Sequence, residues 1–275
     1  YMMLDQGIQT RYSTEQDEQM KIAGTPFKRS FNTYGTVNSI RALAVSSNVY
    51  MFKSVIKLAG GNYVYNQPLG ITNEMAQETF KLMRNYYSMF GLGTKTGLDV
   101  PNEAQGFTGN TMNPGLLLDY SIGQYDNYTP IQLVQYAATI ANGGKKVQPK
   151  LVNTATEVNT DYTVYENKTQ VLSALPGSKE DLETIQMGFR EVVAGEHAID
   201  PIKALDVQVA AKTGTAEVGN YTNASLVGYA PYDKEAKVAF ACSVPESATN
   251  DQSVAGNLCA YNIMPEVLKE FFKKY

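Results

Sequence analysis

The stretch Val207-Gln-Val-Ala-Ala-Lys-Thr-Gly-Thr-Ala-Glu217 decides the fold that we predict for this chain. Small and β-branched residues lead into Lys212, and two further apolar runs, Ala224–Ala230 and Val238–Val244, follow within hairpin distance. This pattern is typical of neighbouring strands in an antiparallel sheet. We therefore expect three such strands, with the side chain of Lys212 at an edge that faces a groove.

The tetrapeptide Lys212-Thr213-Gly214-Thr215 within this strand suits an anion or an acyl group. Lys212 supplies a positive charge, and Thr213 places a hydroxyl beside it. Gly214 lacks the side chain that would keep a substrate's backbone away, and Thr215 offers an N–H and a second hydroxyl. The alternative is a solvated turn, since a three-residue match is common by chance.

Length and composition indicate a globular protein. The 275 residues suffice for one domain, or for one domain with a small lobe, and 43% of them are hydrophobic. A net charge of −4 argues against a nucleic-acid binder, because phosphate recognition needs a positive field. No apolar run approaches the ~18 residues of a membrane span, and the first residues do not resemble a signal peptide. Any anchor or export signal of a parent protein is expected outside this sequence.

The few cysteines and histidines limit the chemistry that we expect. Cys242 and Cys259 do not have metal-site spacing, and a single histidine, His197, argues against a zinc site or a histidine-based triad. We therefore expect no metal and no cofactor. Cys242 falls in a predicted strand and Cys259 in a predicted helix; we favour two buried free thiols, with a disulfide as the alternative.

Apolar periodicity and capping residues predict a series of helices. Residues 1–35 are expected to be irregular, a first helix to begin at Val37, and a second to extend from Val49 to Ala59. Ser46-Ser47-Asn48 stands between these two helices, and its alternative role is ordinary helix capping. Further expected elements are a helix from Thr72 to Phe90, a helix after Thr129-Pro130, a strand over Lys145–Val152, a loop or hairpin over residues 153–170, a helix from Ser178 to Ala194, and a helix over Val254–Lys274.

Ser46-x-Asn48 at a helix junction, followed by Lys212-Thr213-Gly214 on a strand, resembles the second and third motifs of penicillin-binding proteins. The sequence between and after them is similar to the transpeptidase domain of the monofunctional, class B members. The matching segments are Phe90-Gly-Leu-Gly93, Thr96-Gly-Leu-Asp-Val-Pro-Asn-Glu103, Ser121-Ile-Gly-Gln124, Thr129-Pro-Ile-Gln-Leu133, Ala141-Asn-Gly-Gly144 and Gly228-Tyr-Ala-Pro231. A second Lys-Thr-Gly, at Lys95, is set aside because only the copy at Lys212 lies on a predicted sheet strand.

This resemblance implies both a fold and an activity. The implied fold is α+β: a partial antiparallel sheet like that of penicillin-binding proteins and serine β-lactamases, flanked by helices. A helical subdomain is expected at about residues 36–144 and a sheet-side region at about residues 145–275. The implied activity is a D-Ala-D-Ala transpeptidase, which cross-links peptidoglycan stem peptides through a serine acyl-enzyme and is a β-lactam target. The implied location is the extracytoplasmic face of the bacterial cell membrane, with cell-wall synthesis or division proteins as partners.

The resemblance also implies roles for individual residues. Ser46 relays a proton towards the leaving amine, and Asn48 binds the substrate amide and orients the catalytic lysine. Lys212 binds the terminal carboxylate or its β-lactam mimic, and the Thr215 N–H supplies half of the oxyanion hole. The residues implied to bind substrate are Ser47, Thr213, Gly214 and Thr215.

One motif of the family is absent from this sequence. The Ser-x-x-Lys that carries the nucleophile precedes Ser-x-Asn in the family, and nothing before Ser46 matches it. Ser54-Val-Ile-Lys57 has the right letters but follows Ser46 inside an apolar helix, so we interpret it as a coincidence. We expect a C-terminal piece of a longer parent, inactive alone, whose upstream part is a partner. Two alternatives remain: a serine β-lactamase or β-lactam sensor of the same superfamily, and a non-catalytic cell-wall scaffold.

Overall fold

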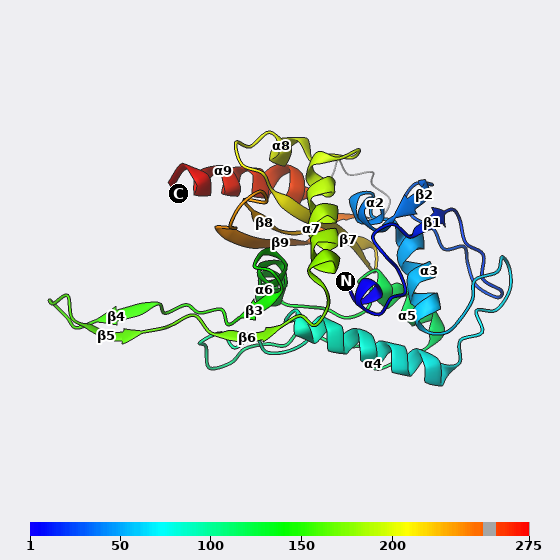
Figure 1. The fold of residues 1–275 in the computed structure, drawn as a ribbon, viewed down its shortest axis with the longest axis horizontal. Helices are drawn as coiled ribbons and strands as arrows, with labels where there is room; N and C mark the ends of the chain where they lie inside the picture. Colours follow the sequence, from blue (N-terminus) through cyan, green and yellow to red (C-terminus); the bar gives the residue numbers. More distant parts are fainter. Residues whose placement is uncertain (250–256, 275) are drawn as a thin grey trace.

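A three-stranded antiparallel sheet forms the centre of the computed structural model, which describes residues 1–249 and 257–274 (Figure 1). Its strands, in spatial order, are β7 (Ala210–Val218), β8 (Tyr221–Ala230) and β9 (Val238–Thr249). The three strands predicted from the sequence are confirmed. β7 begins three residues later than expected, at Ala210.

Helices cover both faces of this sheet. On one face, Ala210 and Tyr229 pack against Ile140 of α6 (Pro130–Ala141) and Phe189 of α7 (Lys179–Ala194). On the other face, residues such as Ala211 and Leu226 pack against three short elements and the end of α7. These elements are α8 (Asp200–Lys203), the π-helical turn η1 (Cys259–Ile263) and α9 (Met264–Lys274). The fold is α+β, as predicted.

The helical part has a core of its own. It contains α1 (Met2–Asp5), α2 (Ser39–Ala44), α3 (Asn48–Leu58), α4 (Asn73–Met89) and α5 (Pro114–Ser121). Phe80 of α4 stacks on Tyr120 of α5 with ring centroids 5.0 Å apart. α2 packs on α7 and thereby joins this part to the sheet, while α6 packs on β8 and β9. The division near residue 144 therefore stays a proposal.

Local capping signals predicted the helix starts well. Thr72, Thr129 and Ser178 are the N-caps of α4, α6 and α7, each with a capping box. The N-terminal region differs from the prediction, because the polar strand β1 (Thr14–Asp17) pairs with β2 (Gly35–Asn38). This pairing occupies the start of the first predicted helix, so α2 begins at Ser39. Such a strand has no apolar alternation that a sequence reading can detect.

A long two-stranded arm extends away from the body (Figure 1). Its base is formed by β3 (Lys145–Val147) and β6 (Val171–Ala174), and its outer part by β4 (Thr154–Thr156) and β5 (Thr163–Glu166). The predicted hairpin is confirmed, although the strand expected to reach Val152 ends at Val147.

The predicted C-terminal helix is present only from η1 onwards, and its first expected residues, 254–256, lie outside the described part of the chain. Among residues 1–249 and 257–274, no helix combines the length and apolar character that crossing a bilayer requires.

Candidate active site

Ser46 and Lys212 meet where the helical part contacts the sheet. Ser46 lies in the junction between α2 and α3 and has φ of +54°, in the left-handed region that non-glycine residues rarely adopt. The Lys212 Nζ donates a hydrogen bond to the Ser46 Oγ. The structure thus brings together one residue from each of the two predicted motifs.

The Lys212 amine is held close to the strand from which it projects. Its Nζ also donates to the Thr213 carbonyl oxygen at 2.9 Å. Burial lowers the pKa of Lys212 to about 8. Desolvation disfavours the charged form, and no carboxylate of residues 1–249 or 257–274 counters this effect. The site therefore contains an amine that is mostly charged at pH 7 and mostly neutral at pH 9.

The outer edge of β7 carries backbone groups that have no strand partner. In the part of the chain that the structure describes, β7 pairs with β8 alone. Gln124 Nε2 reaches the Glu217 carbonyl oxygen at 2.7 Å from outside the sheet. Because backbone groups alternate in direction along an antiparallel strand, Thr213, Thr215 and Glu217 all face this edge. The Thr215 N–H thus points outwards from this edge of the sheet.

The threonine hydroxyls lie on a different face from the lysine. Side chains alternate along a strand, so Thr213 and Thr215 project to the face opposite Lys212. Thr213 is half-buried and Thr215 is exposed. Both therefore flank the edge of β7, and their role in binding a carboxylate stays a prediction.

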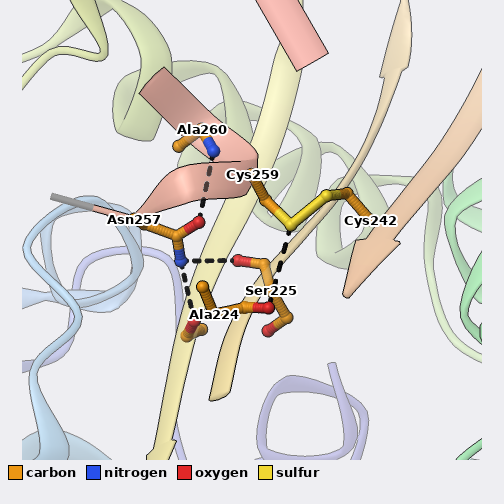
Figure 2. Close-up of a disulfide and its surroundings, with 7 residues drawn as sticks. Ala224, Ser225, Cys242, Asn257, Cys259 and Ala260 are labelled. Carbon is orange, nitrogen blue, oxygen red and sulfur yellow. Dashed lines mark hydrogen bonds between the residues drawn. A yellow bond between two sulfur atoms is a disulfide. The ribbon is translucent and has the colours of Figure 1, made fainter. Parts of the chain in front are cut away.

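Gly214 is required by packing inside the sheet. A Cβ at this position would lie 2.4 Å from the Oγ of Ser225 on β8. Asn257 Nδ2 bridges the carbonyl oxygens of Gly214 and Ser225, at 2.8 and 2.9 Å (Figure 2). The same Asn257 caps η1 through the N–H of Ala260. The glycine thus leaves room for the Ser225 side chain, and Asn257 ties β7 to β8 beside the candidate site.

The two cysteines form a disulfide, so our preference for free thiols was wrong. Cys242 of β9 is bonded to Cys259 of η1, with their Cα atoms 5.7 Å apart (Figure 2). They are 17 residues apart in the sequence and become neighbours only when η1 packs on the sheet. Sequence reasoning had no signal for that approach. The bond fastens the segment that carries Asn257 to β9.

Asn48 and Ser47 differ in their accessibility. Asn48 is the first residue of α3, and its Nδ2 donates to the Arg29 carbonyl oxygen at 3.3 Å. Ser47 is only 1% exposed; it is the N-cap of α3 and donates its hydroxyl to Asp17. A substrate cannot reach that hydroxyl. The structure therefore removes Ser47 from the predicted substrate-binding set.

The two competing motif copies lie away from this contact. Ser54 is fully buried within α3 and donates to the Tyr50 carbonyl oxygen at 2.7 Å, so it cannot act as a nucleophile on an external substrate. Lys95 is exposed in the connection after α4, and the neighbouring Thr96 is fixed by Glu103. Within the described residues, no group of three or more His, Cys, Asp or Glu side chains is placed to hold a metal ion.

The chain matches known proteins over most of its length. Residues 1–265 match the family model of the penicillin binding protein transpeptidase domain. Penicillin-binding protein 2A of Bacillus subtilis is 36% identical over 263 residues, which are 90% of this chain and 35% of that protein. Penicillin-binding protein H of the same organism is 38% identical over 253 residues, 86% of this chain and 35% of the relative.

Solved structures show the same relationship. Penicillin-binding protein 2B from Streptococcus pneumoniae (strain R6) superposes with a TM-score of 0.89 at 27% identity, covering all of this chain and 46% of that one. The chain belongs to the family of penicillin-binding protein transpeptidase domains. It spans about a third of the length of the first curated relatives that it matches.

Proposed function

We propose that the protein containing this chain is a peptidoglycan D,D-transpeptidase that cross-links stem peptides through a serine acyl-enzyme. The observation that carries the proposal is the hydrogen bond from Lys212 to Ser46, which joins the two motifs at the open edge of β7. Relatives bearing that name support it: Peptidoglycan D,D-transpeptidase MrdA of Acinetobacter baumannii is 28% identical over 231 residues, 73% of this chain and 30% of that protein.

In this mechanism the nucleophilic serine comes from the part of the parent that lies outside this sequence. Its hydroxyl gives its proton to the lysine of the same Ser-x-x-Lys, its oxygen attacks the penultimate D-Ala carbonyl, and the C–N bond to the terminal D-Ala breaks. The departing amine needs a proton. Lys212 donates to the Ser46 oxygen, so the Ser46 O–H can point at that amine. Ser46 then gives its proton to the amine and takes up the proton that the upstream lysine received from the nucleophile.

The remaining residues bind and orient the substrate. The charged form of Lys212, with the hydroxyls of Thr213 and Thr215, attracts the terminal carboxylate or its β-lactam mimic. The Thr215 N–H stabilises the developing oxyanion, a contribution that typically amounts to ~2.7–4 kcal/mol for one donor. The Asn48 amide is proposed to bind the substrate amide.

Labelling with a fluorescent penicillin tests the proposal. The complete parent should acquire a covalent label on the serine of its Ser-x-x-Lys, whereas the isolated chain should remain unlabelled. A folded parent without label would support the scaffold alternative. Rapid hydrolysis of the label, with no release of D-Ala from a stem peptide, would support the β-lactamase alternative.

The proposal extends to location and partners. We place the parent at the extracytoplasmic face of the cell membrane, where peptidoglycan is assembled, with cell-wall synthesis proteins as its partners. A solved complex of penicillin-binding protein PBP2 with MreC from Helicobacter pylori is an example of such an assembly in the same fold, at 20% identity. Protease access to the domain from outside intact protoplasts would test the location.

A further inference from the structure

A buried carboxylate lies directly behind the Ser46–Asn48 turn. Asp17 is the last residue of β1 and is 1% exposed. Its Oδ2 accepts hydrogen bonds from Ser30 Oγ, at 2.6 Å, and from Ser47 Oγ. None of the ion pairs among the described residues includes Asp17. The two serine hydroxyls are thus the groups that compensate this buried acid.

The same two serines also serve the start of α3. Ser30 Oγ accepts from the Val49 N–H at 3.2 Å, and Ser47 Oγ accepts from the Tyr50 N–H at 3.0 Å. The first N–H groups of a helix have no partner within the helix itself. Because both serine hydroxyls donate their hydrogen bonds to Asp17, the lone pairs of the serine oxygens are directed to these N–H groups. Asp17 thereby orients both hydroxyls that accept hydrogen bonds from the first N–H groups of α3.

This arrangement fixes the residue that precedes the cap. Ser46 is held in the left-handed region, which costs energy for a residue with a side chain and persists only where the surroundings impose it. Ser47 follows it directly and is anchored to Asp17, while Asn48 is anchored to the carbonyl of Arg29. The turn is therefore held from its buried side, and the Ser46 hydroxyl is left facing Lys212.

We propose that Asp17 is a positioning residue of the acyl-transfer site. Acting through Ser47 and Ser30, it keeps Ser46 in the conformation that meets Lys212. Asp17 itself touches no substrate. The inference rests on the proposed function and adds to it a residue outside the three family motifs.

Two substitutions at Asp17 in the complete parent separate its effects. Asp17→Asn keeps the shape and an acceptor oxygen, whereas Asp17→Leu keeps the branching of the side chain but leaves both hydroxyls without an acceptor. The assay is acylation by a fluorescent penicillin. It yields two quantities, the dissociation constant of the noncovalent complex and the rate constant of bond formation. We expect Asp17→Leu to slow bond formation by roughly ten- to a hundredfold, the scale of an ångström-sized misplacement. The dissociation constant should change little, because Lys212 still binds the carboxylate, and Asp17→Asn should restore most of the rate.

A matched pair of cap variants separates positioning from stability. Ser47→Ala removes the cap of α3, and Thr72→Ala removes the corresponding cap of α4, far from the site. Both should lower the thermal midpoint, but only Ser47→Ala should slow acylation. This comparison decides the matter even if Asp17→Leu fails to fold.

The outcomes distinguish the inference from the proposed function. If the wild-type parent is not acylated at all, both are overturned. If it is acylated and the Ser47→Ala and Thr72→Ala variants form the bond at equal rates, the function stands and the role of Asp17 is overturned. Faster bond formation in Asp17→Leu than in Asp17→Asn would overturn it as well.

Discussion

The charge of Lys212 should set the upper pH limit of acylation. Burial lowers the pKa of this amine to about 8. About nine-tenths of the molecules then carry the charge at pH 7, and about one-tenth at pH 9. If the carboxylate of a β-lactam binds the charged form, as we propose, the second-order rate constant should fall about tenfold between these values. The fall should steepen to about tenfold for each further pH unit.

The assay is stopped-flow acylation of the complete parent from pH 6 to 10, with Lys212→Arg as the reference. Arginine stays charged throughout this range. The rate constant of the wild type divided by that of Lys212→Arg therefore isolates the titration of Lys212 from that of other groups. The contribution of Lys212 to the free energy of unfolding should rise with pH, whereas the acylation rate falls. Between the folded pKa of about 8 and the ordinary value of 10.5, the unfolded chain binds more protons at this residue, so its contribution to stability rises with pH.

Two results would refute this reasoning. A ratio that rises through pH 8 would mean that the neutral amine accepts a proton from Ser46, so that Lys212 is a base and not a carboxylate site. A ratio that is flat from pH 6 to 10 would mean that the charge of Lys212 does not take part in acylation.

Three further predictions use the same parent or the isolated chain. Lys212→Ala should lose most penicillin labelling while Lys95→Ala, in an exposed connection, stays near wild type; equal losses would contradict our assignment of the two motif copies. Reducing the Cys242–Cys259 disulfide, which spans 17 residues, should lower the free energy of unfolding by about 3 kcal/mol in denaturant titrations. The free energy of unfolding of a variant that carries both Cys242→Ser and Cys259→Ser should not change when reductant is added. The isolated chain should self-associate in analytical ultracentrifugation, because β9 pairs with β8 alone in the described region and leaves an edge open; a monomer with fully protected strand amides would contradict this.

The features that the sequence predicted well are those encoded locally. Thr129-Pro130 and Ser178 mark helix starts because the side chain, the proline ring and the N–H groups concerned lie within four residues of one another. The strand at Lys212 was recognised from its composition and its apolar neighbours. The resemblance to penicillin-binding proteins identified Ser46 and Lys212 as candidates, although only the folded chain shows that they touch.

The features that the sequence did not reveal depend on distant partners. Asp17 belongs to a polar strand without periodicity, and its importance comes from Ser30 and Ser47, which approach it only in the fold. The resemblance implied that Ser47 binds substrate, yet its hydroxyl is buried and donates to Asp17. Gln124 likewise reaches Glu217 from 93 positions away.

The arm formed by β3 to β6 is a suitable site for cleavage and for insertion in experiments on this domain. Each of its two ladders is short and contains a register shift, and its outer strands are exposed. Two-stranded ribbons of this length have little stability of their own. Limited proteolysis should therefore nick the tip near Asp161 first and leave the body intact. A fluorophore or an affinity tag inserted at that tip would report on the domain from a distance, without disturbing the contact between Ser46 and Lys212.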